Sequence, residues 1–208
     1  DLIAAEDTRH TSRLLAHYCI RTPLISYHDH NEQQRTPQLL EKIRTGSAVA
    51  IVSDAGTPSV SDPGFRLVRA AAESGLDVFP IPGVSAAVTA LSASGLPTDT
   101  FVFVGFVPRK TGKRMTVLRA LVDEPRTLVF YESPRRLSAF LEDVRALMGN
   151  RQVVVAREMT KMHEEFIRGS VADVLAVLAG RADVRGECTV LVECAPPAAA
   201  VTDEALQT

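Results

Sequence analysis

The sequence of 208 residues lacks the features that define several protein classes. No stretch approaches the roughly 20 consecutive apolar residues of a membrane span, and no basic segment followed by an apolar one opens the chain. The three cysteines, Cys19, Cys188 and Cys194, form no close pair. Neither a disulfide framework nor a four-ligand zinc site is therefore predicted, and we expect a cytoplasmic protein with reduced thiols.

An excess of positive charge is also absent. The chain carries 23 Lys and Arg against 25 Asp and Glu, a net charge of −2. Proteins that coat nucleic acid are usually clearly basic, so a local patch would have to bind any polyanion. The remaining composition, 46% hydrophobic and 23% charged, is that of an ordinary globular chain with one large or two small cores.

The first half of the chain alternates strand and helix patterns. Short β-branched runs predict strands at Pro23–Tyr27, Ala48–Ser53 and 77–82. Helices are predicted from Thr36 as N-cap and Pro37 in the first turn to Gly46, from about Phe65 to Gly75, and over Gly83–Gly95. Strands joined by such crossovers predict a parallel sheet that is covered on both faces.

The pattern changes after Leu96–Thr100. Strands are predicted in "FVFVGF", "RTLVFYE", "QVVVARE" and "CTVLVEC", with helices between them. The segment Glu164–Gly169 follows a strand after only a short loop, which favours an antiparallel neighbour. Ser170 and Asp173 have the spacing of a capping box. We therefore predict two α/β lobes, residues 1–97 and 98–195, and a flexible tail over 196–208.

Two unusual turns follow predicted strands of the first lobe. One begins at Asp54 and contains Gly56 and Pro58; the other, Pro82–Gly83, bends the chain into a helix of small residues. The carboxyl ends of parallel strands are where α/β proteins bind ligands, and small residues leave backbone groups accessible. Neither turn is a GxxxxGK[ST] or GxGxxG motif, so nucleoside triphosphates and dinucleotides are disfavoured. A purely structural turn remains the alternative at each place.

Seven motifs in this order resemble the bacterial ribosomal small-subunit RNA 2'-O-ribose methyltransferase I family of the tetrapyrrole methylase superfamily. They are "EDTRHTSRLL", "SDAGTPSVSDPGF", "PIPGVSAAVTALSASGLP", "GFVPRK", "FYESPRR", "AREMTKMHEEFIRG" and "GECTVLVE". The resemblance runs from Asp1 to about Glu193. It implies a two-lobed α/β fold with a mostly parallel N-terminal sheet, a mixed C-terminal sheet and a cofactor cleft between the lobes. It also implies a homodimer.

The resemblance further implies the reaction: S-adenosylmethionine methylates the ribose 2'-hydroxyl of a cytidine in small-subunit (16S) ribosomal RNA. The family's cofactor turns match two segments here, and Thr57 stands where the superfamily has an aspartate, so Asp54 is the nearest carboxylate. The implied cofactor contacts are Asp54, Ala55, Gly56, Thr57, Pro58, Val60, Pro82, Gly83, Val84, Ser85, Ala86, Tyr131 and Glu132.

Candidate catalytic and RNA-binding residues are charged groups near the expected cleft. The catalytic candidates are Glu6, Asp7, Arg157, Glu158 and Lys161, with Arg9, His10 and Glu132 also near. The RNA candidates are Arg109, Lys110, Lys113 and Arg114, in a predicted loop that continues to Arg119, together with Arg135 and Arg136. A solvated surface is the alternative for each charge. His28 and His30 are weak metal candidates, and no metal is predicted.

The family also has a strand and a "TPIGN"-like loop before "EDTRHT" and a helical segment after the last strand. The chain is therefore expected to be a fragment of such a protein. Two other functions remain open: a methylase of a tetrapyrrole or other small molecule, and a cofactor-binding module without activity.

Overall fold

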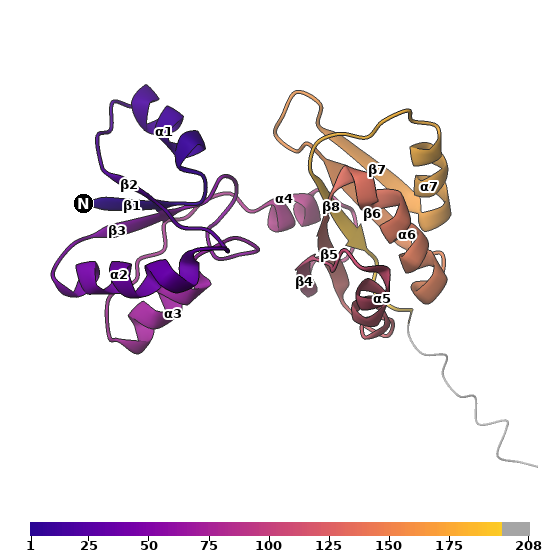
Figure 1. The fold of residues 1–208 in the computed structure, drawn as a ribbon. Helices are drawn as coiled ribbons and strands as arrows, with labels where there is room; N and C mark the ends of the chain where they lie inside the picture. Colours follow the sequence, from indigo (N-terminus) through magenta and orange to yellow (C-terminus); the bar gives the residue numbers. More distant parts are fainter. Residues whose placement is uncertain (197–208) are drawn as a thin grey trace, which may run out of the picture. The chain divides into compact units, whose positions relative to one another are not determined.

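The computed structural model describes residues 1–196, which form two compact units, Asp1–Ser85 and a second unit that starts at Ala86 (Figure 1). Except for Pro196, the tail predicted from the sequence lies outside the described residues. None of the helices in the described part of the chain combines the length and apolar character that crossing a membrane requires.

The N-terminal unit is a three-stranded parallel sheet in the order β2 (Leu24–Ser26), β1 (Leu2–Ala5), β3 (Val49–Val52). Helix α1 (Thr8–His17) lies on one face, and α2 (Glu32–Arg44) and α3 (Phe65–Glu73) lie on the other (Figure 1). The core of this unit consists of Ala4, Tyr27, Leu39 and Leu67. The predicted parallel sheet with two covered faces is confirmed.

Helix α2 begins earlier than the sequence indicated. Asn31 occupies the N-cap position, and Pro37 lies inside the helix instead of in its first turn. The side chain of Asn31 accepts a hydrogen bond from the backbone N–H of His28 at 2.9 Å, which fixes the turn that leads into the helix. The Thr36 hydroxyl donates to the carbonyl of Glu32 at 2.7 Å, so the predicted N-cap role of Thr36 was wrong.

The segment 77–82 forms no strand, contrary to the prediction. Pro80 and Pro82 lack the N–H donor that a ladder of strand hydrogen bonds needs. Phe79 and Ile81 are 78% and 83% exposed, respectively. The apolar residues of this segment therefore do not pack as a strand of the N-terminal sheet.

The C-terminal unit has a mixed sheet, as predicted. Its five strands within the described residues have the order β4-β5-β8-β6-β7. Strands β4 (Phe101–Phe106) and β5 (Thr127–Glu132) are parallel. Strand β8 (Cys188–Val192) runs antiparallel to β5 and to β6 (Gln152–Arg157), and β7 (Glu165–Ser170) runs antiparallel to β6. The predicted antiparallel partner after β6 is thus confirmed.

Four helices belong to the described part of this unit. One large core lies between the sheet and α5 (Thr111–Arg119), α6 (Pro134–Met148) and α7 (Val171–Ala179). The predicted capping box of Ser170 and Asp173 starts α7. A smaller core on the other face joins α4 (Ala86–Ser92) to residues such as Val129 and Leu191. Because α4 packs on this sheet, the boundary between the units lies before the helix, whereas the sequence placed it after.

Candidate functional site

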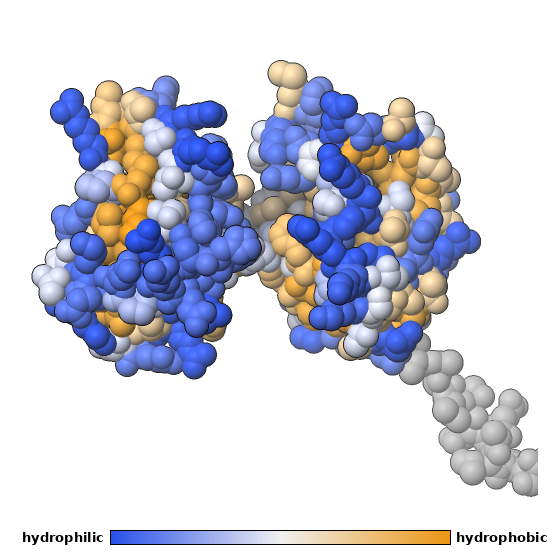
Figure 2. All heavy atoms as spheres, viewed as in Figure 1, coloured by the Kyte–Doolittle hydropathy of each residue, from blue (hydrophilic) through white to orange (hydrophobic). Residues whose placement is uncertain are grey.

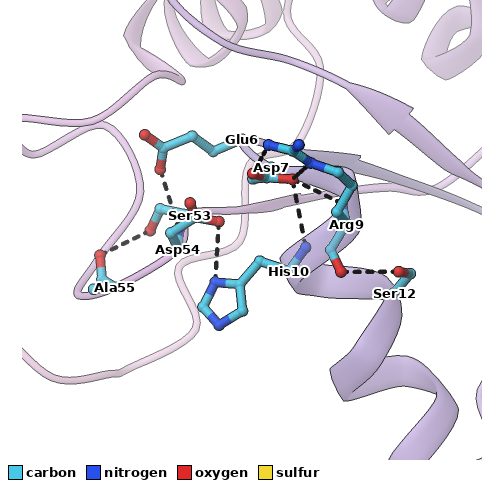
Figure 3. Close-up of polar contacts among 8 residues, drawn as sticks. All are labelled: Glu6, Asp7, Arg9, His10, Ser12, Ser53, Asp54 and Ala55. Atoms are coloured by element: carbon cyan, nitrogen blue, oxygen red, sulfur yellow. Dashed lines mark hydrogen bonds and ion pairs between the residues drawn. The ribbon is translucent and has the colours of Figure 1, made fainter.

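The carboxyl edge of the parallel sheet brings together residues that are far apart in the sequence. The last residues of β1 and β3, Ala5 and Val52, are paired, so the residues that follow them are neighbours. The Glu6 Oε2 atom accepts a hydrogen bond from the backbone N–H of Asp54 at 3.1 Å. The His10 Nδ1 atom lies 3.4 Å from Asp54 Oδ1 (Figure 3). Motifs separated by nearly fifty residues therefore form one polar site.

Asp7 has a structural role at this edge. Its Oδ1 atom accepts hydrogen bonds from the backbone N–H groups of Arg9 and His10 at 2.8 and 3.4 Å, which makes it the N-cap of α1. The hydrogen bond from the Arg9 side chain holds the pKa of Asp7 well below its usual range. Asp7 thus starts the helix that carries His10, and it is a poor proton acceptor at neutral pH.

The first predicted ligand turn is tightly wound. Gly56 has a φ of +74°, which favours glycine, and Val60 donates its N–H to the carbonyl of Thr57 at 3.4 Å. Ser59 and Ser61 adopt left-handed φ values of 71° and 63°, which are uncommon for residues with a side chain. Backbone strain of this kind occurs preferentially at functional loops. Asp54, Ala55 and Gly56 are all exposed.

A hydrogen bond joins the second turn to the first. The Thr57 hydroxyl donates to the backbone carbonyl of Val84 at 2.9 Å. A β-carbon placed on Gly83 would come no closer than 4.0 Å to its nearest neighbours, the Ile81 carbonyl oxygen and Thr57 Oγ1. Packing within the chain therefore does not require glycine here. The exposed backbone at this turn is therefore accessible to a ligand.

Asp62 adds a further acidic group near this edge. Burial raises its pKa to about 6, with contributions from the negative charges of Glu6, Asp29 and Asp54. The folded protein therefore binds the proton of the Asp62 carboxyl more tightly than the unfolded chain does. As the pH rises from about 4 to 6, the contribution of Asp62 to the free energy of unfolding decreases.

We expect Asp62→Asn to raise the melting temperature at pH 7.5, where the wild type carries a partly buried charge. At pH 4 the two proteins should melt at nearly the same temperature, because the folded wild type is then protonated. Calorimetric melting at both pH values tests this, with Asp77→Asn at an exposed position as control. If Asp62→Asn changed the melting temperature equally at both pH values, the raised pKa of Asp62 would be contradicted.

Glu132 lies inside the C-terminal unit. Its side chain is fully buried and forms an ion pair with Arg136. Its Oε1 atom also accepts the backbone N–H of Ser133 at 2.6 Å. The burial of Glu132 contradicts its predicted cofactor contact. The Arg136 side chain is 25% exposed in the same ion pair, so its predicted RNA contact stays a prediction. Tyr131, the residue before Glu132, is only partly buried.

The catalytic candidates after β6 lie in two ion-pair networks. The Glu158 Oε1 atom accepts hydrogen bonds from Lys161 Nζ and from the N–H of Glu187, both at 2.9 Å. These bonds lower the pKa of Glu158, and the carboxylates of Glu158 and Glu187 raise the pKa of Lys161. Arg157 donates to Glu165 Oε2 at 3.1 Å. Lys161 therefore stays protonated at neutral pH, and neither Glu158 nor Lys161 is suited to accept a proton.

The basic segment is a helix, not the predicted loop, from Thr111 onward. Arg114 is 4% exposed, and its Nε donates to Asp143 Oδ2 at 2.6 Å on α6. Arg114 therefore belongs to the core and cannot contact RNA as predicted. Arg109, Lys110 and Lys113 are exposed, and Arg135 is also exposed.

His28 and His30 lie after β2, with ring centroids 6.0 Å apart. The His28 ring contacts the side-chain amide of Asn31 at 3.1 Å. Within residues 1–196, no group of three or more His, Cys, Asp or Glu side chains is arranged to hold a metal ion.

Comparison with known proteins gives consistent relationships. The family model for tetrapyrrole (corrin/porphyrin) methylases matches residues 1–175. The chain is 50% identical over 205 residues to ribosomal RNA small subunit methyltransferase I of Micromonospora olivasterospora, covering 99% of this chain and 66% of that protein. It is 51% identical over 195 residues to the protein of the same name from Escherichia coli O157:H7, covering 93% and 68%. The chain thus spans about two thirds of the length of these relatives.

The fold also resembles solved structures of more distant proteins. One is uroporphyrin-III C-methyl transferase from Thermus thermophilus complexed with S-adenyl homocysteine. The TM-score is 0.60 at 19% identity, over 92% of this chain and 84% of that chain. At this identity the likeness concerns the fold alone.

Proposed function

The chain belongs to the ribosomal RNA small subunit methyltransferase I family of the tetrapyrrole methylases, and from this we propose that it is an S-adenosylmethionine-dependent methyltransferase of small-subunit ribosomal RNA. The proposed acceptor is the ribose 2'-hydroxyl of a cytidine, and the proposed location is the cytoplasm. The structural observation that supports the proposal most is the pair of turns, Ala55–Pro58 and Pro82–Ser85, which are exposed at Gly56 and Gly83. The bond between Thr57 and Val84 joins the two turns.

In this proposal the two turns bind the cofactor mainly through their backbone. Gly56 and Gly83 allow close approach, and the Thr57 hydroxyl fixes the distance between the turns. S-adenosylmethionine supplies an electrophilic methyl group on a positively charged sulfur. The chain's task is to hold donor and acceptor in line and to help remove the hydroxyl proton.

The remaining candidates for the general base lie at the carboxyl edge of the parallel N-terminal sheet. Hydrogen-bond partners lower the pKa of Asp7 and of Glu158 and raise the pKa of Lys161, so none of the three is suited to accept a proton from the ribose hydroxyl. An arginine such as Arg157 does not deprotonate. Glu6 and His10 remain, both in contact with Asp54. A Glu6→Gln variant that methylates at the wild-type rate would leave His10 as the candidate.

The position of the methyl group can be measured directly. Alkaline hydrolysis of RNA uses the 2'-hydroxyl as nucleophile, so a 2'-O-methylated nucleotide leaves an alkali-resistant dinucleotide. We propose that small-subunit RNA labelled by the protein yields one such dinucleotide that begins with cytidine. Label released as a mononucleotide methylated on its base would refute the 2'-O assignment while leaving RNA methylation in place.

We expect the exposed basic residues of the C-terminal unit to bind RNA phosphates. Lys110→Glu with Lys113→Glu should weaken binding to small ribosomal subunits about ten-fold or more, since one hydrogen bond to a charged group contributes about 1.5–3 kcal/mol. The slope of log affinity against log salt should become shallower by about one for each lost contact. Binding of S-adenosylmethionine, measured by calorimetry, should not change.

The matched control for this pair is Arg13→Glu with Arg21→Glu, which reverses two exposed charges of the N-terminal unit. An equal loss of affinity in both double variants would mean that net charge, and not the segment after β4, controls binding.

We also propose that the protein is a homodimer. Figure 2 shows apolar surface between polar regions of the N-terminal unit, and the exposed apolar side chains of that unit include Leu14 and Ile20, at 54% and 45% exposure. Exposed apolar surface of this kind is typical of association sites. Light scattering should give twice the monomer mass at micromolar concentration; a monomer mass across that range would contradict the proposal.

A further inference from the structure

Strand β4 contains an irregularity just before its end. Phe103 pairs with Val129 of β5, but the next pairs are Gly105 with Phe130 and Phe106 with Tyr131. Val104 is therefore an extra residue, a β-bulge, and Gly105 next to it has a φ of +70°. A bulge changes the direction of the side chains that follow it, and bulges occur often beside functional sites.

The consequence of the bulge is the position of Phe106. In a regular strand, residues three apart point to opposite faces. Phe103 and Phe106 nevertheless both contact the ring of Tyr131, with centroid distances of 5.0 and 5.5 Å and edge-to-face geometry. The bulge thus moves Phe106 from the face covered by α5, α6 and α7 to the face on which α4 packs.

Phe106 is 59% exposed in this position. Single exposed apolar residues are common and need no explanation. Here, however, a bulge and a left-handed glycine hold the phenyl ring at the surface, where Tyr131 fixes its orientation from one side. In a regular strand the same ring would point to the face of the larger core, on which Val102 and Val104 lie. The bulge therefore accounts for the position of the ring at the surface.

Charge next to the ring indicates what it could bind. Arg109 and Lys110 follow Phe106 by three and four residues, so their α-carbons lie within about 11 and 14 Å of it. Together with Lys113 they are exposed, and none of the three forms an ion pair with any residue between Asp1 and Pro196. An exposed aromatic ring beside unpaired cations is the combination that binds single-stranded nucleic acid, through base stacking and phosphate contacts.

We propose that Phe106, supported by Tyr131, is a stacking surface for one unpaired nucleobase of the RNA substrate, while Arg109, Lys110 and Lys113 bind the adjoining phosphates. This inference rests on the proposed function and adds to it a specific contact that the sequence did not indicate. It explains how a chain with a net charge of −2 obtains affinity for RNA from a small surface.

The test compares Phe106→Ala, Phe106→Leu and Phe106→Trp. Phe106→Ala and Phe106→Leu should weaken binding of a short single-stranded RNA by roughly 5- to 150-fold, the range that stacking of one base gives. Phe106→Trp should bind this RNA about as tightly as the wild type, because indole also stacks on a base. The salt dependence of binding should stay unchanged in all three, because no phosphate contact is removed. Fluorescence anisotropy measures RNA affinity, and calorimetry measures the affinity for S-adenosylmethionine, which should equal that of the wild type.

Phe101→Ala is the matched control, since Phe101 lies on the same strand and is 37% exposed at its other end. Circular dichroism confirms that each variant is folded. Wild-type RNA affinity in Phe106→Ala overturns the inference, as does an equal loss in Phe101→Ala. If Phe106→Ala loses affinity for S-adenosylmethionine but not for RNA, the ring contacts the cofactor's adenine and the inference is overturned. A change of Phe106→Ala from dimer to monomer mass also overturns it, because the ring would then belong to the subunit interface.

Failure of the proposed function gives a different result. If the wild-type protein neither binds nor methylates RNA, the proposed function and this inference fail together. If the wild type methylates small-subunit RNA and Phe106→Ala does so with the same KM and kcat, only the stacking surface is excluded.

Discussion

Gly83→Val is expected to abolish binding of S-adenosylmethionine and to leave the fold unchanged. The space around Gly83 is open, because a β-carbon placed there would lie 4.0 Å from its nearest neighbours in the chain. A β-carbon therefore fits at this position, and the larger valine side chain would occupy the space in which the proposed cofactor approaches the backbone. The neighbouring Val84 carbonyl would keep its hydrogen bond from Thr57.

Calorimetric titration with S-adenosylmethionine measures this effect, and circular dichroism and the melting temperature report the fold. Gly83→Ala should give an intermediate affinity because its side chain is smaller. Gly112→Val is the control, since nothing lies within 4 Å of a β-carbon at that exposed helical position. Unaltered affinity in Gly83→Val would place the cofactor elsewhere.

Arg114→Ala is expected to destabilise the C-terminal unit by about 3–5 kcal/mol, the usual cost of removing one partner of a buried ion pair. The Arg114 side chain is 5% exposed and that of Asp143 is 16% exposed, with a distance of 2.6 Å between Nε and Oδ2. Without Arg114, the Asp143 carboxylate has no compensating charge. A loss of this size is a large fraction of the total stability of a typical domain, about 5–15 kcal/mol.

Urea denaturation measures this loss, and Arg119→Ala on the exposed face of the same helix should change stability by less than about 0.5 kcal/mol. The double variant Arg114→Met with Asp143→Leu should recover much of the stability, because it removes both charges together. If Arg114→Ala were as stable as the wild type but bound RNA more weakly, Arg114 would be an RNA contact after all.

Local patterns predicted the strands of the C-terminal unit and several helices correctly. The runs at β5, β6 and β8 are β-branched and buried on both faces, and the capping box of Ser170 and Asp173 is a strictly local signal. Segment 77–82 is also rich in apolar residues but forms no ladder, because its prolines cannot donate hydrogen bonds. The start of α2 was missed because the side chain of Asn31, not that of Thr36, organises the turn.

The sequence indicated the site less completely than the fold. The turns at Gly56 and Gly83 were predicted from glycine and proline patterns, but the bond between Thr57 and Val84 depends on folding. The burial of Arg114 depends on Asp143, which lies on another helix. Similarly, the exposure of Phe106 depends on the bulge where β4 pairs with β5. The alternation of residues within a single strand does not predict such a bulge. Long-range pairing therefore determines which charged and aromatic residues can contact a substrate.

Transfer of a tritiated methyl group from S-adenosylmethionine to competing acceptors tests the proposed function most directly. The protein is incubated with isolated small ribosomal subunits, with the corresponding naked RNA and with uroporphyrinogen III, and the label in each acceptor is counted. We predict that label enters ribosomal RNA in at least one of the first two samples, is absent from the tetrapyrrole and is lost in Gly83→Val. Label in the tetrapyrrole with none in either RNA sample would contradict the account.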